Sequence, residues 1–221
     1  FEFAMERMRR LRSNISANDS VSRFSSLGVD VFIGSGEFIS RDRISVAGTE
    51  LKFRKAVIAS GASPFVPPIE GIDQVNVLTN ETIFNLTELP KKLIVVGGGP
   101  IGMEIAQSFT RLGSEVTVIE KGVQILGRSD RQASEVLADQ LRKEGLDLRL
   151  ETSLTKLSSK NGVSIAHIES GFGTKEIEAD AILMSIGRKP NITGMGLDKA
   201  GVKTDPHEGV LIDDFFRSTN K

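Results

Sequence analysis

The segment that most constrains the fold is a glycine-rich turn near the middle of the chain. Residues 93–102 have the sequence LIVVGGGPIG, in which four large apolar residues precede the spacing G-x-G-x-x-G. The apolar run predicts a buried strand, and the residues after the turn predict a helix over 100–112. A turn of this kind between a strand and a helix is typical of a Rossmann-like α/β domain, in which it holds the phosphates of a dinucleotide.

Each residue of the turn has an expected task in such a domain. Gly97 permits the tight turn, Gly99 lets the backbone approach a pyrophosphate, and Gly102 lets the helix pack closely on the strand. The other candidate cofactor-binding positions complete the turn and begin the helix: Gly98, Pro100 and Ile101. Pro100 has no N–H for a ligand, although its fixed φ suits a first helical turn. The helix N-terminus offers free N–H groups and partial positive charge to a phosphate.

An acidic residue indicates which dinucleotide the turn would bind. Glu120 ends a second predicted strand over 115–119, about 20 residues beyond the turn. A carboxylate there accepts hydrogen bonds from the adenosine ribose of NAD and repels the 2′-phosphate of NADP. Lys121 follows directly and weakens this preference, so NAD is favoured and NADP stays open. The alternative is a strand–helix turn that binds nothing, and the strand, helix and acid together argue against it.

The chain around the turn predicts a parallel sheet with a β-meander. Strands are predicted at 93–96, 115–119, 146–150 and 181–186, with helices at 100–112 and about 130–144. Three short strands near 154–157, 163–168 and 175–177 would form the meander. Strand–helix alternation favours parallel strands with right-handed crossovers. Asn161-Gly162 predicts a type I′ hairpin turn between the first two meander strands.

The flanking segments are less regular. The N-terminal part predicts helices over 1–15 and from about Ser20 to Leu27, followed by short β-type runs at 29–33, 43–46 and 50–53 and a buried apolar strand at 56–59. Residues 76–89 predict a connecting segment, and the end of the chain is rich in turns, with one strand at 210–212.

Composition excludes several classes of function. The 28 Lys and Arg against 29 Asp and Glu leave a net charge of -1, without the basic excess of a nucleic-acid-binding protein. The chain has no Cys and 2 His, so we expect no disulfide, cysteine nucleophile or metal site within it. No apolar run approaches the ~20 residues of a membrane-spanning helix. Absence of Cys fits a cytoplasmic protein. Arginines at 7–12 leave a phosphate-binding role open, but a solvated helix face is favoured.

Other polar residues are weaker candidates for chemistry. His167 shares a strand face with Ile165 and is expected to be packed or half-exposed. His207 is expected in a solvated turn. Asp213 and Asp214 would point to opposite faces if they extended a strand, and so would not act together. No catalytic residue and no metal ligand is therefore expected in this chain.

Three motifs together resemble the pyridine nucleotide-disulfide oxidoreductases, which are FAD flavoproteins. Residues 56–64, AVIASGASP, are similar to the family's A-T-G-x-x-P segment beside the flavin. Residues 97–104, GGGPIGME, lead to Glu120, and residues 182–191, ILMSIGRKPN, resemble the G-R-x-P-N strand end that returns to the FAD domain. Their order and spacing agree over nearly the whole chain, and further features resemble the branch of mercuric reductase and dihydrolipoamide dehydrogenase.

The resemblance implies further site residues. Glu104 would lie near the nicotinamide carboxamide, and Gly187 would pass close to the nicotinamide ribose. Ser60, Gly61 and Ala62 would lie beside the flavin, with Ser60 standing where the family usually has Thr. The alternative interpretations are a solvent-facing helix acid for Glu104 and a simple strand-end turn for Gly187.

The resemblance also implies a domain organisation and an activity. Residues 89–191 would be the NAD(P)-binding domain, and residues 1–88 and 192–221 would be parts of a discontinuous FAD-binding domain. The parent enzyme, a homodimer, would pass hydride from NAD(P)H to FAD and on to a disulfide or metal ion. The family's redox-active Cys pair, its own FAD-binding glycine motif and its C-terminal His-Glu pair are not found here, so we expect no turnover by this chain alone. The alternative, from another class, is a module that binds NAD without catalysis.

Overall fold

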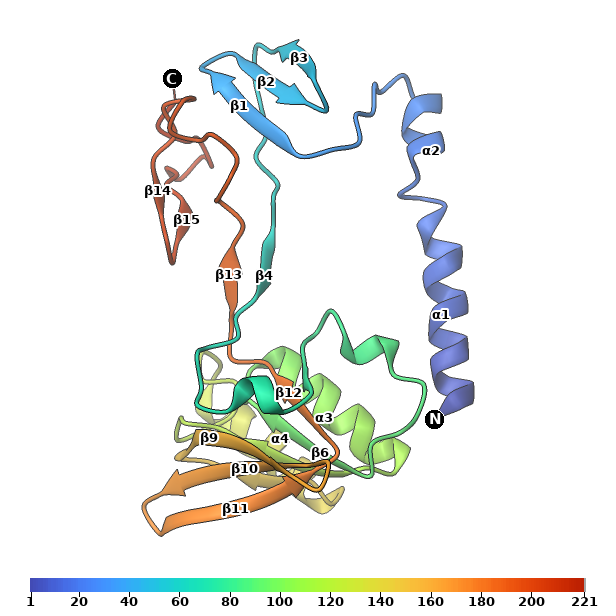
Figure 1. Cartoon of the computed structure of the whole chain (residues 1–221), viewed down its shortest axis with the longest axis vertical. Helices are drawn as coiled ribbons and strands as arrows, with labels where there is room; N and C mark the ends of the chain where they lie inside the picture. The colour runs from blue at the N-terminus through green and yellow to red at the C-terminus, as the bar shows by residue number, and fades with distance from the viewer. Residues whose placement is uncertain (221) are drawn as a thin grey trace. The chain divides into compact units, whose positions relative to one another are not determined.

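The computed structural model describes residues 1–220, which divide into two compact units (Figure 1). Unit 1 contains Phe1–Met8 and Pro64–Gly187, and unit 2 contains Arg9–Ser63 and the residues from Arg188 onward. Unit 1 therefore begins its main segment before residue 89, where the NAD(P)-binding domain is predicted to start. Lys221, the last residue of the predicted segment 192–221, lies outside the described residues.

A parallel sheet forms the centre of unit 1, as predicted, and it has five strands instead of the four expected. Its strand order is β5-β12-β6-β7-β8. The strands are β5 (Val77–Leu78), β6 (Lys92–Val96), β7 (Glu115–Ile119), β8 (Asp147–Arg149) and β12 (Ala181–Met184). The sequence does not predict β5, which lies within the segment expected to be only a connection. From β6 the chain moves outward to β7 and β8, and then returns to β12 on the other side of β6. In open α/β sheets, ligands bind at the carboxyl edge where the strand order reverses in this way.

Two helices follow the glycine-rich turn and β7 at the predicted positions. Helix α3 (Pro100–Leu112) connects β6 to β7, and α4 (Arg131–Lys143) connects β7 to β8. The side chain of Asp130 caps α4 by accepting a hydrogen bond from Ala133 N at 3.0 Å. Gly113, with φ +107°, stops α3 in the left-handed conformation that favours glycine.

The sheet separates two hydrophobic cores because alternate residues of a strand point to opposite faces. Leu93 and Val95 of β6 pack on the side of α3 and α4. Ile94 and Val96 pack on the side of the meander, among Leu157 and other buried residues. Burial on both faces explains why the sequence of β6 is apolar without a break. Figure 1 shows the helices on one face of the sheet and the meander on the other.

The meander consists of three antiparallel strands in the order β11-β10-β9. They are β9 (Thr152–Lys160), β10 (Val163–Ser170) and β11 (Gly173–Ala179), each longer than predicted. Asn161 and Gly162 join the first two with φ of +52° and +81°. Positive φ at both positions is the requirement of the type I′ turn that the sequence predicts.

Unit 2 is built from short elements. Its antiparallel sheet contains β1 (Gly36–Ser40), β2 (Arg43–Val46) and β3 (Thr49–Lys52), and two strand pairs join β4 (Ala62–Pro64) to β13 (Arg188–Pro190) and β14 (Thr204–Asp205) to β15 (Gly209–Val210). Its small core places Phe38 among residues from the end of the chain: Leu197, Ala200 and Val202. Helix α2 (Val21–Ser26) belongs to unit 2, α1 (Glu2–Ser16) begins in unit 1 and ends in unit 2, and two single 3₁₀ turns of unit 1 lie at Ile72–Gln74 and Ile83–Asn85. Ser20 caps α2, with its side chain accepting a hydrogen bond from Arg23 N.

Two predicted strands are wrong. Residues 29–33 are irregular and exposed, and the first strand begins only at Gly36. Residues 56–59 are also irregular, and Val57 is 91% exposed instead of buried. An apolar run becomes a strand only where a neighbour supplies ladder partners, and neither run pairs with a strand among residues 1–220. Within the same residues, no helix has the length and apolar character to cross a membrane.

Candidate functional site

The glycine-rich turn lies at the carboxyl end of β6, next to the carboxyl end of β12. Gly97 is buried with φ +108°, and a Cβ there would stand 2.6 Å from the carbonyl oxygen of Ser185. A Cβ at Gly102 would stand 2.1 Å from the carbonyl oxygen of Gly97. Both distances are too short for a real Cβ, so the packing of the turn itself requires glycine at these two positions.

At Gly99, no contact within the protein explains why the residue is glycine. A Cβ there would meet no atom within 4 Å, and its φ of −75° is open to any residue. Gly99 is the N-cap of α3, followed by Pro100 as the first helical residue. The first-turn N–H groups of Ile101 and Gly102 have no acceptor within the helix. Open space thus lies beside a helix N-terminus, where a glycine would let an anionic ligand approach the backbone.

Glu120 is joined to the glycine-rich turn through its side chain. Its Oε2 accepts a hydrogen bond from Gly98 N at 2.5 Å, and its Oε1 accepts one from Gly122 N at 2.5 Å. A Cβ at Gly98 would stand 2.9 Å from Oε2, so a side chain there would push the Glu120 carboxylate out of this position. The two backbone donors fix the carboxylate at the carboxyl edge between β6 and β7.

The loop after β7 is also tied to the turn. Leu126 N donates to Gly98 O at 2.7 Å, and Leu126 itself has φ +50°. Lys121, at the start of this loop, is exposed. The sequence does not reveal the roles of Leu126 and Gly122, because both act through backbone N–H groups that every residue type except proline carries.

Ser185 is a further residue of the site that sequence reasoning missed. It directly follows β12, and its Oγ lies 2.9 Å from Val96 O and 3.1 Å from Gly97 O. It belongs to the motif at 182–191, but its pattern alone does not show that its hydroxyl reaches the turn 88 residues earlier in the chain.

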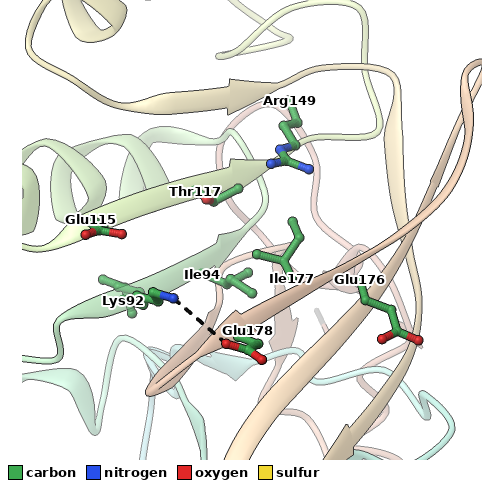
Figure 2. A pocket seen from close by; sticks show the side chains of 9 residues that line it. Lys92, Ile94, Glu115, Thr117, Arg149, Glu176, Ile177 and Glu178 are labelled. Atoms are coloured by element: carbon green, nitrogen blue, oxygen red, sulfur yellow. Dashed lines mark ion pairs between the residues drawn. The ribbon is translucent and has the colours of Figure 1, made fainter.

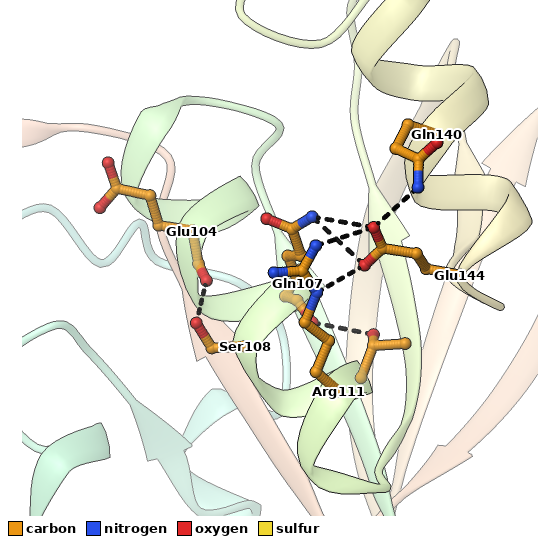
Figure 3. A network of polar contacts seen from close by, with 8 residues as sticks. Glu104, Gln107, Ser108, Arg111, Gln140 and Glu144 are labelled. Carbon is orange, nitrogen blue, oxygen red and sulfur yellow. Dashed lines mark hydrogen bonds and ion pairs between the residues drawn. The ribbon is translucent and has the colours of Figure 1, made fainter.

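Two residues implied by the family resemblance lie at the surface of unit 1. Glu104 is exposed on α3, and Figure 3 shows its carboxylate pointing away from the polar cluster on the same helix. Gly187 is exposed with φ +139°, and its carbonyl accepts a hydrogen bond from Phe65 N at 3.0 Å. Their roles toward a nicotinamide stay predictions.

The predicted flavin segment is joined to the end of the third motif within unit 2. The side chain of Asn191 donates to Ser60 O at 3.0 Å and accepts from the Ser63 hydroxyl at 2.9 Å. Its backbone N donates to Gly61 O at 3.0 Å, and its carbonyl accepts from Ser60 Oγ at 2.7 Å. Ala62 O accepts a hydrogen bond from Arg188. Two motifs about 130 residues apart thus form one connection.

A cluster of polar side chains connects α3 to the end of α4 by hydrogen bonds (Figure 3). Arg111 donates two hydrogen bonds of 2.8 Å to the carboxylate of Glu144, and Gln140 and Gln107 donate further ones. These donors, with Arg111 the strongest, lower the pKa of Glu144 to about 2. The cluster fixes how the helices pack and does not include a residue of the glycine-rich turn.

A shallow hollow of about 270 Å³ lies on the meander side of the sheet (Figure 2). Lys92 and Glu115, the first residues of β6 and β7, line it together with Glu176 and Glu178 of β11. Lys92 Nζ lies 3.9 Å from Glu178 Oε2 across it. The hollow therefore lies toward the amino ends of these strands, whereas the glycine-rich turn follows the carboxyl end of β6.

The remaining candidates have ordinary structural contacts. His167 of β10 is 27% exposed and lies 2.8 Å from Ser158 Oγ and 3.3 Å from Glu176 Oε1, which links the three meander strands. Asp213 is in a turn, not a strand, and pairs with Arg217 at 2.8 Å. Among residues 1–220, no three His, Asp or Glu side chains gather as metal ligands.

Comparison with known proteins gives a consistent result. The family model described as "Pyridine nucleotide-disulphide oxidoreductase" matches residues 5–221. The chain is 32% identical to a mercuric reductase of Bacillus cereus over 200 residues, which cover 90% of the chain and 32% of that protein. It is 36% identical to a mitochondrial dihydrolipoyl dehydrogenase of Pisum sativum over 194 residues, 85% of the chain and 38% of that protein.

A solved structure agrees over the full chain. The HOCl-induced flavoprotein disulfide reductase RclA from Escherichia coli aligns with a TM-score of 0.89 and 30% sequence identity. The alignment covers 100% of this chain and 50% of RclA. The chain thus spans between about a third and a half of the length of these relatives.

Proposed function

We propose a function for this chain, which belongs to the pyridine nucleotide-disulphide oxidoreductase family: the family model matches residues 5–221. Members of this family use FAD and NAD(P)H. We infer that residues 89–191 bind the nicotinamide dinucleotide of a flavoprotein oxidoreductase. We assign residues 1–88 and 192–221 to parts of its FAD-binding domain. When bound, the two cofactors would supply the redox chemistry: NAD(P)H would reduce FAD by hydride transfer, and the reduced FAD would pass two electrons to a disulfide or metal-ion acceptor.

The observation that carries the proposal is the open space at Gly99. Gly97, Gly98 and Gly102 are explained by contacts within the protein, but Gly99 is not. A pyrophosphate in contact with the backbone there would supply the missing reason for glycine. It would also accept hydrogen bonds from the first turn of α3, whose partial positive charge favours an anion.

Glu120 supports NAD as the dinucleotide. Its two oxygens accept backbone N–H groups and so hold the carboxylate at the edge of the site. Each carboxylate oxygen has a second lone pair for a ribose hydroxyl. A 2′-phosphate would bring a second negative charge to the same place, so NADPH is expected to bind more weakly.

The share of the protein in the reaction is orientation. The glycine-rich turn would hold the pyrophosphate, Glu120 would hold the adenosine ribose, and Gly187 would leave room for the nicotinamide ribose. Glu104, exposed on α3, would lie near the nicotinamide carboxamide. Ser60, Gly61 and Ala62, fixed by Asn191, would lie beside the flavin.

Calorimetric titration of the chain with NADH and, separately, NADPH tests this proposal. We expect NADH to bind more tightly than NADPH, and Glu120→Ala to weaken NADH binding. Glu115→Ala is the matched control, because Glu115 begins the strand that Glu120 follows and so lies at the amino ends of the strands, away from the glycine-rich turn. Tighter binding of NADPH would contradict the role of Glu120, and binding of neither would contradict the dinucleotide site.

A further inference from the structure

We propose that Ser185 is a positioning residue of the dinucleotide site, whose hydroxyl holds the glycine-rich turn in the shape that binds a pyrophosphate. This inference rests on the proposed function. Ser185 follows β12 at the point where the strand order reverses, so its side chain lies between the ends of two adjacent parallel strands.

The contacts of Ser185 join the end of β12 to the end of β6 and to the first carbonyl of the glycine-rich turn. Its backbone N donates to Val96 O at 2.8 Å, which continues the ladder between β12 and β6 by one residue. Its Oγ lies 2.9 Å from the same carbonyl and 3.1 Å from Gly97 O. The hydroxyl therefore reaches the first carbonyl of the turn, which the backbone of Ser185 does not.

The first turn of α3 closes over the same group. A Cβ at Gly102 would stand 2.7 Å from Ser185 Oγ and 2.1 Å from Gly97 O. The end of β6, the hydroxyl of Ser185 and the start of α3 thus lie close together, with no room for a side chain at position 102. Removing the hydroxyl is therefore expected to loosen the packing of the turn against α3.

The hydroxyl also changes the charge that the turn presents. Carbonyl oxygens carry partial negative charge and disfavour a nearby anion. A donor shared between Val96 O and Gly97 O offsets part of that charge at the edge where a pyrophosphate is expected. Alanine at position 185 would remove this donor and keep the backbone hydrogen bond to Val96. The expected loss of affinity is roughly three- to tenfold, the range for one hydrogen bond.

The test measures binding of NADH and of ADP-ribose, which has the pyrophosphate but no nicotinamide. We expect Ser185→Ala to weaken both ligands by a similar factor, and Ser185→Thr, which keeps the hydroxyl, to stay within about twofold of wild type. Ser114→Ala is the matched control: Ser114 Oγ donates to Pro90 O at 2.6 Å, a buried hydroxyl–carbonyl bond at the opposite edge of the sheet. It should leave affinity unchanged in the folded chain.

Several results would overturn the inference. Unchanged binding of both ligands by Ser185→Ala would do so, and so would an equal loss of affinity in Ser114→Ala. If Ser185→Ala weakened NADH but not ADP-ribose, the role of Ser185 would lie at the nicotinamide instead of the pyrophosphate. If wild type binds no dinucleotide, the proposed function fails, and hydrogen exchange by NMR decides the role of Ser185 separately. Faster exchange at the Gly97 and Gly98 N–H groups in Ser185→Ala would support the holding role, and unchanged exchange would refute it.

Discussion

The carboxylate of Glu120 accepts a 2.5 Å hydrogen bond from Gly98 N–H, so the acid after β7 and the glycine-rich turn after β6 form one structural unit. The acid has a second such bond, from Gly122. Glu120 therefore has a structural task before any ligand binds, and its variants need a measurement of stability as well as of affinity.

Replacing Glu120 with alanine is expected to lower the free energy of unfolding by about 1–3 kcal/mol, because two backbone N–H groups lose their acceptor. Glu120→Gln keeps one carbonyl oxygen and should lose less. Urea unfolding of the ligand-free chain measures both values. Equal stability of wild type and Glu120→Ala would show that the two hydrogen bonds contribute nothing to folding.

Gly102→Ala is expected to destabilise unit 1 strongly. The new Cβ would lie 2.1 Å from Gly97 O, so the first turn of α3 would have to move away from β6. Overpacking of this kind costs about 1–3 kcal/mol. Gly171→Ala, where a Cβ meets no atom within 4 Å, is the control in thermal unfolding. Similar melting temperatures for the two variants would contradict the close packing of helix on turn.

The acid stability of the chain should depend on Glu144. Its pKa is lowered from 4.5 to about 2, chiefly by the hydrogen bonds from Arg111. Because the folded-state pKa is below the unfolded value, the contribution of Glu144 is fully present above about pH 4.5 and is lost as the pH falls toward 2. Glu144→Gln should therefore flatten the fall in stability over this range.

Denaturant midpoints measured between pH 6 and pH 2.5 test this prediction. Glu135→Gln is the control, since Glu135 is an exposed acid of α4, the helix that Glu144 directly follows. The prediction fails if Glu144→Gln and Glu135→Gln change the pH profile equally.

Asn191→Ala should weaken unit 2 locally. It removes two side-chain hydrogen bonds, to Ser60 O and from Ser63 Oγ, and is expected to cost about 1–3 kcal/mol. Hydrogen exchange should become faster at residues 60–63 and stay unchanged in β6. A uniform change in both regions would show that Asn191 acts on the whole chain instead of on this connection.

The sequence predicted those parts of the fold that follow from local signals. The glycine spacing, the apolar run of β6 and the alternation of strand and helix patterns predicted the central sheet and both crossover helices. The strand predicted at 56–59 was wrong because an apolar run shows a tendency to be buried but does not supply a pairing partner. The two-residue β5 was missed because its partner β12 lies 105 residues later in the chain, where Ile182 pairs with Val77.

The site was predictable only as far as side-chain types reveal it. The glycines and Glu120 follow a recognisable spacing. The contacts of Ser185 with Gly97, and of Gly122 with Glu120, depend on the three-dimensional arrangement of strand ends, which no local pattern records. Gly99 differs, because its place in the glycine spacing is recognisable in the sequence but no contact within the chain explains why glycine is needed there.

NADH titration of Gly99→Ala tests whether a dinucleotide occupies the open space at Gly99. A Cβ at this position meets no protein atom within 4 Å, so we expect the melting temperature of the ligand-free chain to stay near that of wild type. We expect NADH affinity to fall at least tenfold, because the methyl group would occupy the approach of the pyrophosphate to the backbone. Unchanged NADH affinity in a folded Gly99→Ala chain would show that no pyrophosphate approaches the backbone at this position.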